Sequence, residues 1–186
     1  YPLGVDLPGE KRGMIPNDKY YDKNYNGSWN GLTIISIAIG QGEVTATPLQ
    51  IANLGATIAN RGYFITPHVV KEVEDEALDS IYTNKRYTKV SREHYETVVQ
   101  GMRAAVTGGT CRAANLPGLD VCGKTGTAQN RGKDHSAFMG FAPMNNPKIA
   151  VAVYVENGGW GATYGVPIGA LIIEKYLKGE LSAESE

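Results

Sequence analysis

Three strand-like segments follow one another in the second half of the chain and are separated only by short turns. They span residues 119–128, 136–142 and 149–156, and a helical pattern that starts at Pro167 follows them. Connections this short join antiparallel neighbours, because a parallel connection needs a crossover of about a dozen residues or more. The order of elements therefore predicts an α+β fold, in which helices pack on an antiparallel sheet.

Two helices are expected before this sheet. Thr47, Pro48 and Gln50 form a capping-box pattern with proline in the first turn. The apolar residues that follow cover so wide an arc that we expect this helix to be buried. Ser91 is expected to cap a second helix over residues 92–107.

The rest of the sequence divides the chain into an arm and a body. We expect residues 1–46 to form a loop-rich arm and residues 47–181 to hold the helices and the sheet. Residues 1–31 show no periodicity, and the apolar run over residues 31–39 is too short to distinguish helix from strand. Residues 64–73 alternate loosely and predict a further strand.

Composition excludes several classes of partner. The chain has 186 residues, enough for one domain, and a formal net charge of -1, so nothing favours nucleic acid or an anionic membrane surface. It holds no apolar run long enough to span a membrane. It starts at Tyr1, in a sequence typical of a loop inside a domain, and we expect it to be a piece of a longer protein.

The two cysteines leave two interpretations open. Cys111 and Cys122 fit two small core residues, and they equally fit a disulfide that closes a short loop in an oxidising compartment. No metal site is expected, because two cysteines without nearby histidines are a poor set of zinc ligands.

Residues 121–128 combine a strand pattern with reactive side chains. Side chains alternate between faces along a strand, so Lys124 shares a face with Gly126. Thr125 and Thr127 share the other face, and the glycines allow another backbone or a ligand to come close. A cation and hydroxyls on such a strand suit the capture of a carboxylate or a phosphate.

Two motifs include these residues and predict different proteins. Gly118–Thr125 satisfies the phosphate-binding loop G-x-x-x-x-G-K-[ST], whereas Lys124-Thr125-Gly126 is the Lys-Thr-Gly element of serine acyl-transferases that react with penicillin. A phosphate loop needs a strand before its first glycine and a helix at its Lys-Thr, and the flanking residues predict neither. We favour the second motif and keep nucleotide binding as a remote alternative.

Three further stretches, taken in order, make the second assignment specific. They are Gly40–Ala52 (GQGEVTATPLQIA), Gly123–Gln129 (GKTGTAQ), and Ala137–Pro143 (AFMGFAP) leading into Ile149–Asn157. With them the chain resembles the C-terminal half of a penicillin-binding transpeptidase domain, over nearly its whole length. The likeness is greatest to the monofunctional, elongation-type peptidoglycan transpeptidases, and it implies the serine β-lactamase/transpeptidase-like fold.

The resemblance also implies a reaction and its partners. In this family a serine attacks the D-Ala-D-Ala end of a peptidoglycan stem peptide, and the amine of a neighbouring stem resolves the acyl-enzyme. Penicillins mimic the dipeptide, and no cofactor is implied. The implied partners are the stem peptide, β-lactam antibiotics, the upstream half of the same domain and cell-wall elongation proteins. The implied location is the periplasmic face of the bacterial inner membrane, with the anchor outside this chain.

Residue by residue, the resemblance assigns roles to the Lys-Thr-Gly strand. Lys124 would supply positive field and help the proton relay, and Thr125 would bind the substrate carboxylate. Gly126 would let the substrate backbone lie along the strand edge. The backbone N–H of Thr127 would be one of two oxyanion-hole donors, so that Lys124 and Thr127 are the expected catalytic residues.

The chain departs from the family in two motifs. The nucleophile motif S-x-x-K is absent, because none of its serines has lysine three residues on. Ser28-Trp29-Asn30 fits the second motif, S-x-[ND], in its letters only, since it lies just before the Gly-Gln-Gly stretch. We expect both motifs upstream of Tyr1, so that this chain alone forms no acyl-enzyme.

Two alternatives to a transpeptidase stay open. One is a penicillin sensor or carboxypeptidase on the same fold, and the other is a non-catalytic binding module that uses the same sheet. The upstream sequence separates the enzyme from the binding module, since only the enzyme needs a nucleophile there. His135, beside Ser136, is expected to be structural or to line the cleft rather than to act as a base.

Overall fold

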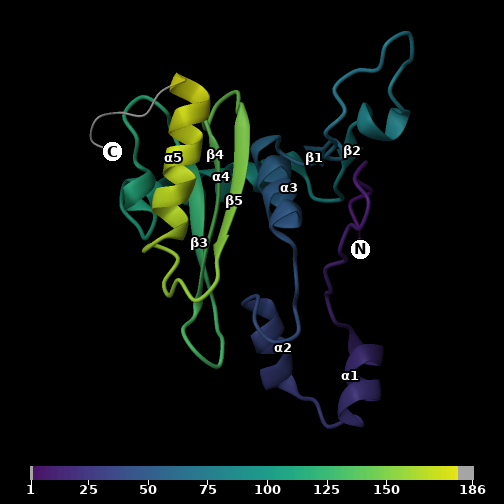
Figure 1. The fold of residues 1–186 in the computed structure, drawn as a ribbon. Helices are drawn as coiled ribbons and strands as arrows, with labels where there is room; N and C mark the ends of the chain where they lie inside the picture. The colour runs from purple at the N-terminus through teal and green to yellow at the C-terminus, as the bar shows by residue number, and fades with distance from the viewer. Residues whose placement is uncertain (1, 180–186) are drawn as a thin grey trace.

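A three-stranded antiparallel sheet lies at the centre of the body, in the order β3-β4-β5 (Figure 1). The computed structural model describes residues 2–179, with β3 over Cys122–Ala128, β4 over His135–Ala142 and β5 over Ile149–Val155. The predicted α+β fold is confirmed. β3 begins later than predicted, because Asp120 has a left-handed φ of 42° that an extended strand does not allow.

Helices cover both faces of this sheet (Figure 1). α5 (Gly165–Lys178) lies against the face that carries Phe138, and α3 (Pro48–Ala59) lies against the face that carries Met139. α4 (Arg92–Thr107) packs mainly on β3. Neighbouring residues of a strand point to opposite faces, so the sheet is the middle layer of the body.

Phe138 occupies the centre of the core under α5. Its side chain is 1% exposed and lies over Gly123 and Gly140, where an added Cβ would approach the ring to 2.5 Å. A Cβ at Gly169 of α5 would overlap with the same ring. Three glycines from three elements therefore make the space for one aromatic ring, and Gly123 of the Lys-Thr-Gly strand serves packing.

The helices α3 and α4 begin where their caps predict. Both hydrogen bonds of the predicted capping box are present between Thr47 and Gln50. Ser91 stands at the N-cap of α4, but its side chain makes no capping hydrogen bond. The expectation of a buried α3 is only partly right, because the side that faces β4 and β5 is buried whereas Leu49 and Leu54 are 42% and 53% exposed.

The arm contains two short helices: the first lies in the stretch that showed no periodicity, and the second lies in the apolar run where helix and strand were left open. α1 (Asp18–Tyr25) is capped by Asn17, and α2 (Gly31–Ala38) is capped by Asn30. Helices of this length depend on their caps and show too few turns for a periodic pattern. The capping role of Asn30 also explains the Ser-Trp-Asn sequence in structural terms.

The predicted strand over residues 64–73 is also wrong. Only Tyr63–Phe64 form a strand, β1, which pairs with β2 (Arg86–Tyr87). Pro67 has no N–H to donate to a ladder, and the carboxylate of Asp6 accepts the N–H groups of both Val69 and Val70. The backbone groups that would have paired with a strand are therefore bonded to a side chain of the arm.

The predicted body ends at residue 181, and its last two residues lie outside the described part of the chain. Within residues 2–179, no helix combines the length and the apolar character that a membrane crossing requires.

Candidate active site

The outer edge of β3 is the side that faces away from β4. In the described part of the chain β3 pairs only with β4. The side-chain amide of Gln41 donates to the carbonyl of Thr127 at 3.0 Å, and the N–H of Gln129 donates to the amide oxygen of Gln41 at 3.4 Å. In an antiparallel strand the N–H and C=O of one residue point the same way, so the N–H of Thr127 also faces this outer edge.

The side chains of the Lys-Thr-Gly strand alternate as predicted. Thr125 is opposite Phe138, on the α5 side, whereas Lys124 is opposite Met139, on the α3 side. The Lys124 side chain is exposed, and its Nζ donates to the Thr125 carbonyl at 3.0 Å. The structure thus places a solvent-exposed cation beside the outer edge.

Both threonine hydroxyls are held by loops that cross the α5 side of β3. The hydroxyls of Thr110 and Thr125 are 2.8 Å apart, and the hydroxyl of Thr127 accepts the N–H of Gly161 at 3.3 Å. Such partners fix the side chains in one orientation. The hydroxyls of Thr110 and Thr125 therefore lie side by side, where a carboxylate can accept a hydrogen bond from the pair.

The loop that contains Gly161 is fastened by Ser136. The buried hydroxyl of Ser136 donates to the Trp160 carbonyl at 2.9 Å and accepts the N–H of Gly165 at 3.0 Å. A Cβ at Gly161 would overlap with the backbone of Gly126, so glycine is required where the loop meets β3. The side chain of Trp160 is 76% exposed beside this contact, where it can touch a ligand.

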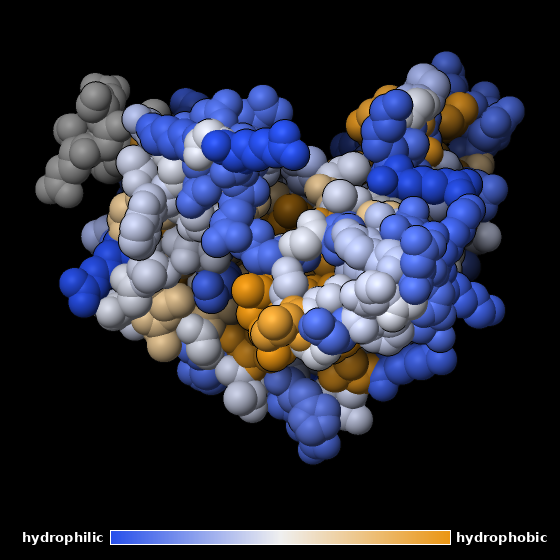
Figure 2. Space-filling model, turned by 90° about the horizontal axis from the view of Figure 1, so that it is seen from below, coloured by the Kyte–Doolittle hydropathy of each residue, from blue (hydrophilic) through white to orange (hydrophobic). Residues whose placement is uncertain are grey.

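A cavity of about 510 Å³ opens beside the end of β3. It lies between β3 to β5 on one side and the segment from α2 to α3 on the other, and its lining is mostly apolar. Viewed from the α2 end of the molecule, hydrophobic side chains gather on this face (Figure 2). The lining residues are Ile39, Gly40, Gln41, Val44, Thr45, Ala46, Pro48, Ile51, Gly126, Thr127, Ala128, Ala137 and Tyr154.

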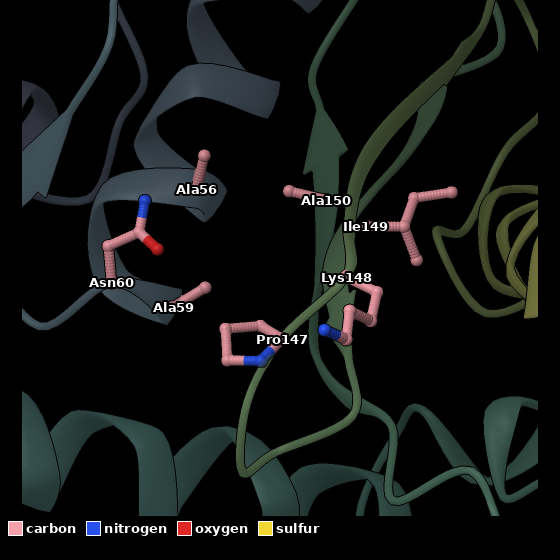
Figure 3. A pocket seen from close by; sticks show the side chains of 7 residues that line it. All are labelled: Ala56, Ala59, Asn60, Pro147, Lys148, Ile149 and Ala150. Atoms are coloured by element: carbon pink, nitrogen blue, oxygen red, sulfur yellow. The ribbon is translucent and has the colours of Figure 1, made fainter.

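A second, smaller cleft of about 140 Å³ lies between the end of α3 and the start of β5 (Figure 3). Its lining combines apolar residues with the polar side chain of Asn60, and Lys148 is its one charged residue. It lies at the turn between β4 and β5, away from the Lys-Thr-Gly residues. We assign no chemistry to it.

The structure has both cysteines as free, buried thiols. Cys111 packs in the cluster under α5, whereas Cys122 packs in the cluster under α3 and α4. This agrees with the interpretation as core residues rather than with the disulfide. Burial raises the pKa of the Cys111 thiol, and it raises the pKa of Cys122 to about 11, so both thiols are poor nucleophiles at neutral pH.

His135 has a structural position. Its Nδ1 accepts the N–H of Asn157 at 3.0 Å, and its ring packs on Tyr154 with centroids 5.3 Å apart. The structural position is one of the two roles expected for His135, which was expected to be structural or to line the cleft.

The phosphate-loop alternative is contradicted by the course of the chain. β3 continues through Lys124 and Thr125 to Ala128, so no helix begins at the Lys-Thr pair. Without a helix N-terminus there is no dipole or row of N–H groups for a phosphate.

The predicted site residues Lys124, Thr125, Gly126 and Thr127 lie next to one another on β3, whereas the contact of Gln41 was not predicted from the sequence. The sequence signal that could have indicated this contact was the glycine on each side of Gln41. Gly40 and Gly42 have φ of 75° and 68°, a conformation that favours glycine.

Residues 2–177 match the family of the penicillin binding protein transpeptidase domain. The peptidoglycan D,D-transpeptidase MrdA of Acinetobacter baumannii is 35% identical over 187 residues, which cover 86% of this chain and 27% of that protein. The crystal structure of Pseudomonas aeruginosa PBP2 in complex with WCK 5153 is similar with a TM-score of 0.80 and 36% identity, over 96% of this chain and 40% of that chain. PBP2 of Helicobacter pylori, in its complex with MreC, is similar with a TM-score of 0.81 and 28% identity, over 97% of this chain and 34% of that chain. The chain thus spans less than a third of the length of the curated relatives that it matches.

Proposed function

The chain belongs to the family of penicillin-binding protein transpeptidase domains, and we propose that it is the C-terminal part of an elongation-type peptidoglycan D,D-transpeptidase. Its reaction is serine acyl transfer to the D-Ala-D-Ala end of a stem peptide. The observation that carries this proposal is the outer edge of β3, where the N–H of Thr127 points outward beside the exposed ammonium group of Lys124.

The residues of β3 have different roles in the proposed reaction. A substrate carboxylate binds to the hydroxyl of Thr125, next to the positive charge of Lys124. The substrate backbone lies along Gly126, and the developing oxyanion accepts the N–H of Thr127. A donor aimed at such a charge is worth roughly 3–4 kcal/mol of transition-state stabilisation. Lys124 also takes part in the proton relay to the leaving amine.

The nucleophile is a serine of the upstream half of the domain, so this chain alone forms no acyl-enzyme. The exposed apolar side of α2 supports this division of the domain. Leu32, Ile35 and Ile39 are 74%, 59% and 71% exposed, although a monomer rarely leaves such a cluster open. The upstream half covers this side of α2 in the longer protein.

The partners follow from the same assignment. β-Lactams react as mimics of the dipeptide, and the protein works with elongation proteins at the periplasmic face of the inner membrane. The complex of Helicobacter pylori PBP2 with MreC supports a partner of this kind. The membrane anchor lies outside this chain.

The test is intact mass after incubation with benzylpenicillin. The full-length protein that contains this chain should gain one penicillin, and the 186-residue chain used as a control should gain none. A folded full-length protein without an adduct would favour the binding module instead. An adduct on the short chain would place the nucleophile among its own serines.

A penicillin sensor would form the adduct but would not join a stem peptide to an amine acceptor, so a cross-linking assay separates it from a transpeptidase.

A further inference from the structure

Gln41 joins the arm to the outer edge of β3, and we infer that it is a positioning residue for acyl transfer. It fixes the peptide group that carries the Thr127 carbonyl, and this group is joined through the Cα of Thr127 to the N–H that the proposed function uses as an oxyanion donor. The inference rests on that proposed function. It assigns a task to the Gly-Gln-Gly stretch, which lies 86 positions before Thr127 in the sequence.

The amide side chain of Gln41 replaces a neighbouring strand at the end of β3. Its Nε2 donates to the Thr127 carbonyl at 3.0 Å, and its Oε1 accepts the N–H of Gln129 at 3.4 Å. A primary amide has a donor and an acceptor side by side, as a peptide group has. It therefore satisfies two outward-facing backbone groups at the end of β3 at once and restrains the backbone on both sides of Ala128.

Gln41 is itself anchored to α2. Its backbone N–H donates to the Ser36 carbonyl at 3.0 Å, so the end of α2 fixes the position from which the side chain reaches β3. The left-handed glycines on both sides allow the tight turn out of the helix. Any movement of α2 is thus transmitted to the carbonyl of Thr127.

The contact also marks where an added peptide must stop. An extended peptide that pairs with β3 would use the outward-facing groups of alternate residues. Gln41 already occupies the Thr127 carbonyl and the Gln129 N–H, and Lys124 bonds to the Thr125 carbonyl, which leaves the N–H of Thr127 to the substrate. The substrate strand therefore has to end, or to displace Gln41, at the peptide where the chemistry takes place.

The experiment uses the full-length protein with Gln41→Ala, Gln41→Glu and Gln100→Ala. Gln100 is exposed on α4 and is the matched control. Benzylpenicillin acylation is followed over a range of concentrations, to separate the dissociation constant of the initial complex from the acylation rate constant. Hydrogen exchange of residues 127–129 and thermal denaturation are measured on the same samples.

For Gln41→Ala we expect an acylation rate constant about tenfold lower, the factor expected for the lost hydrogen bond to the Thr127 carbonyl, with an unchanged dissociation constant and a Tm lowered by no more than a few degrees. The Gln129 amide should exchange faster. Gln41→Glu keeps an acceptor for Gln129 but has no donor for the Thr127 carbonyl, so its acylation should be at least as slow. Gln100→Ala should behave as wild type.

Three results would overturn the inference. In the first, wild type is acylated and Gln41→Ala is acylated just as fast; this result overturns the inference and leaves the proposed function intact. Another is a loss of Tm and of protection across the whole sheet, which would make Gln41 merely structural. A folded wild type that is not acylated at all would overturn the proposed function and this inference with it.

Discussion

The interior around Phe138 and the outer edge of β3 belong to the same sheet, but different interactions hold them. Phe138 is closed in by glycines of three elements and is 1% exposed, so its position is set by packing alone. At the outer edge, Lys124 is exposed, and the backbone at Thr127 is held by a single side chain of the arm. The difference shows that one sheet supplies both a rigid support and an accessible reactive surface.

The largest effect is expected at the outer edge, and it should be on activity alone. In the full-length protein, Lys124→Ala should slow penicillin acylation about a thousandfold, in the range of a lost proton-relay group. Its Tm should not change, because the exposed side chain bonds only to the Thr125 carbonyl. Lys148→Ala, an exposed lysine beyond the other end of the sheet, is the control. An acylation rate within threefold of wild type would remove Lys124 from the proposed chemistry.

The interior should show the opposite behaviour. Gly169→Ala places a Cβ into the Phe138 ring and should cost about 2 kcal/mol of unfolding free energy, as overpacking of a core does. Gly101→Ala, at an open position of α4, should be neutral or stabilising by about 0.5–1 kcal/mol. Chemical denaturation of the full-length protein measures both. If Gly169→Ala were as stable as Gly101→Ala, the interior would be less tightly packed than the structure indicates.

A smaller effect on the arm should depend on the length of the protein. Leu32→Ser should cost about 1–2 kcal/mol in the full-length protein, where the upstream half buries this side chain, and far less in the 186-residue chain. Light scattering should show that Leu32→Ser lowers the self-association of the 186-residue chain. Chemical denaturation measures the loss of stability in each of the two proteins. Tyr176→Ser, at an exposed position of α5, should have the same small effect in both proteins. Equal losses for Leu32→Ser in both would show that no upstream segment covers α2.

The smallest effect is expected where the arm folds back on itself. The hydroxyl of Tyr21 donates to one carboxylate oxygen of Glu43 at 2.6 Å, and the hydroxyl of Tyr25 donates to the other oxygen. These bonds lower the pKa of Glu43 from its ordinary 4.5, and the bond from Tyr21 has the larger effect. A carboxyl whose pKa is lowered on folding stabilises the fold above its unfolded pKa. This contribution should therefore be lost as the pH falls below about 4.5 through the folded pKa.

Fluorescence of Trp29 measures this change, because its ring lies 5.9 Å from that of Tyr21. A Trp160→Phe background removes the other tryptophan. Glu43→Gln should remove the acid transition of the fluorescence. If the transition persists in Glu43→Gln, it belongs to another carboxyl of the arm, such as Glu10, whose pKa is also lowered.

The body could be predicted from the sequence because its signals are local. Alternating strands with short turns predicted the sheet, and Thr47 and Ser91 marked the starts of α3 and α4. The strand proposed over residues 64–73 failed because its N–H groups bind Asp6, which lies more than sixty positions earlier. α1 was missed because caps without apolar periodicity define it.

By itself, the sequence determined the antiparallel sheet, its helical cover and the strand that carries Lys124, Thr125 and Thr127, since periodicity, caps and motifs act over a few residues. Only the tertiary structure decided that the Thr127 N–H faces the outer edge and that Gln41 holds the end of this edge. Such contacts join residues far apart in the chain through single hydrogen bonds. Their geometry depends on how whole elements pack, and no local pattern encodes it.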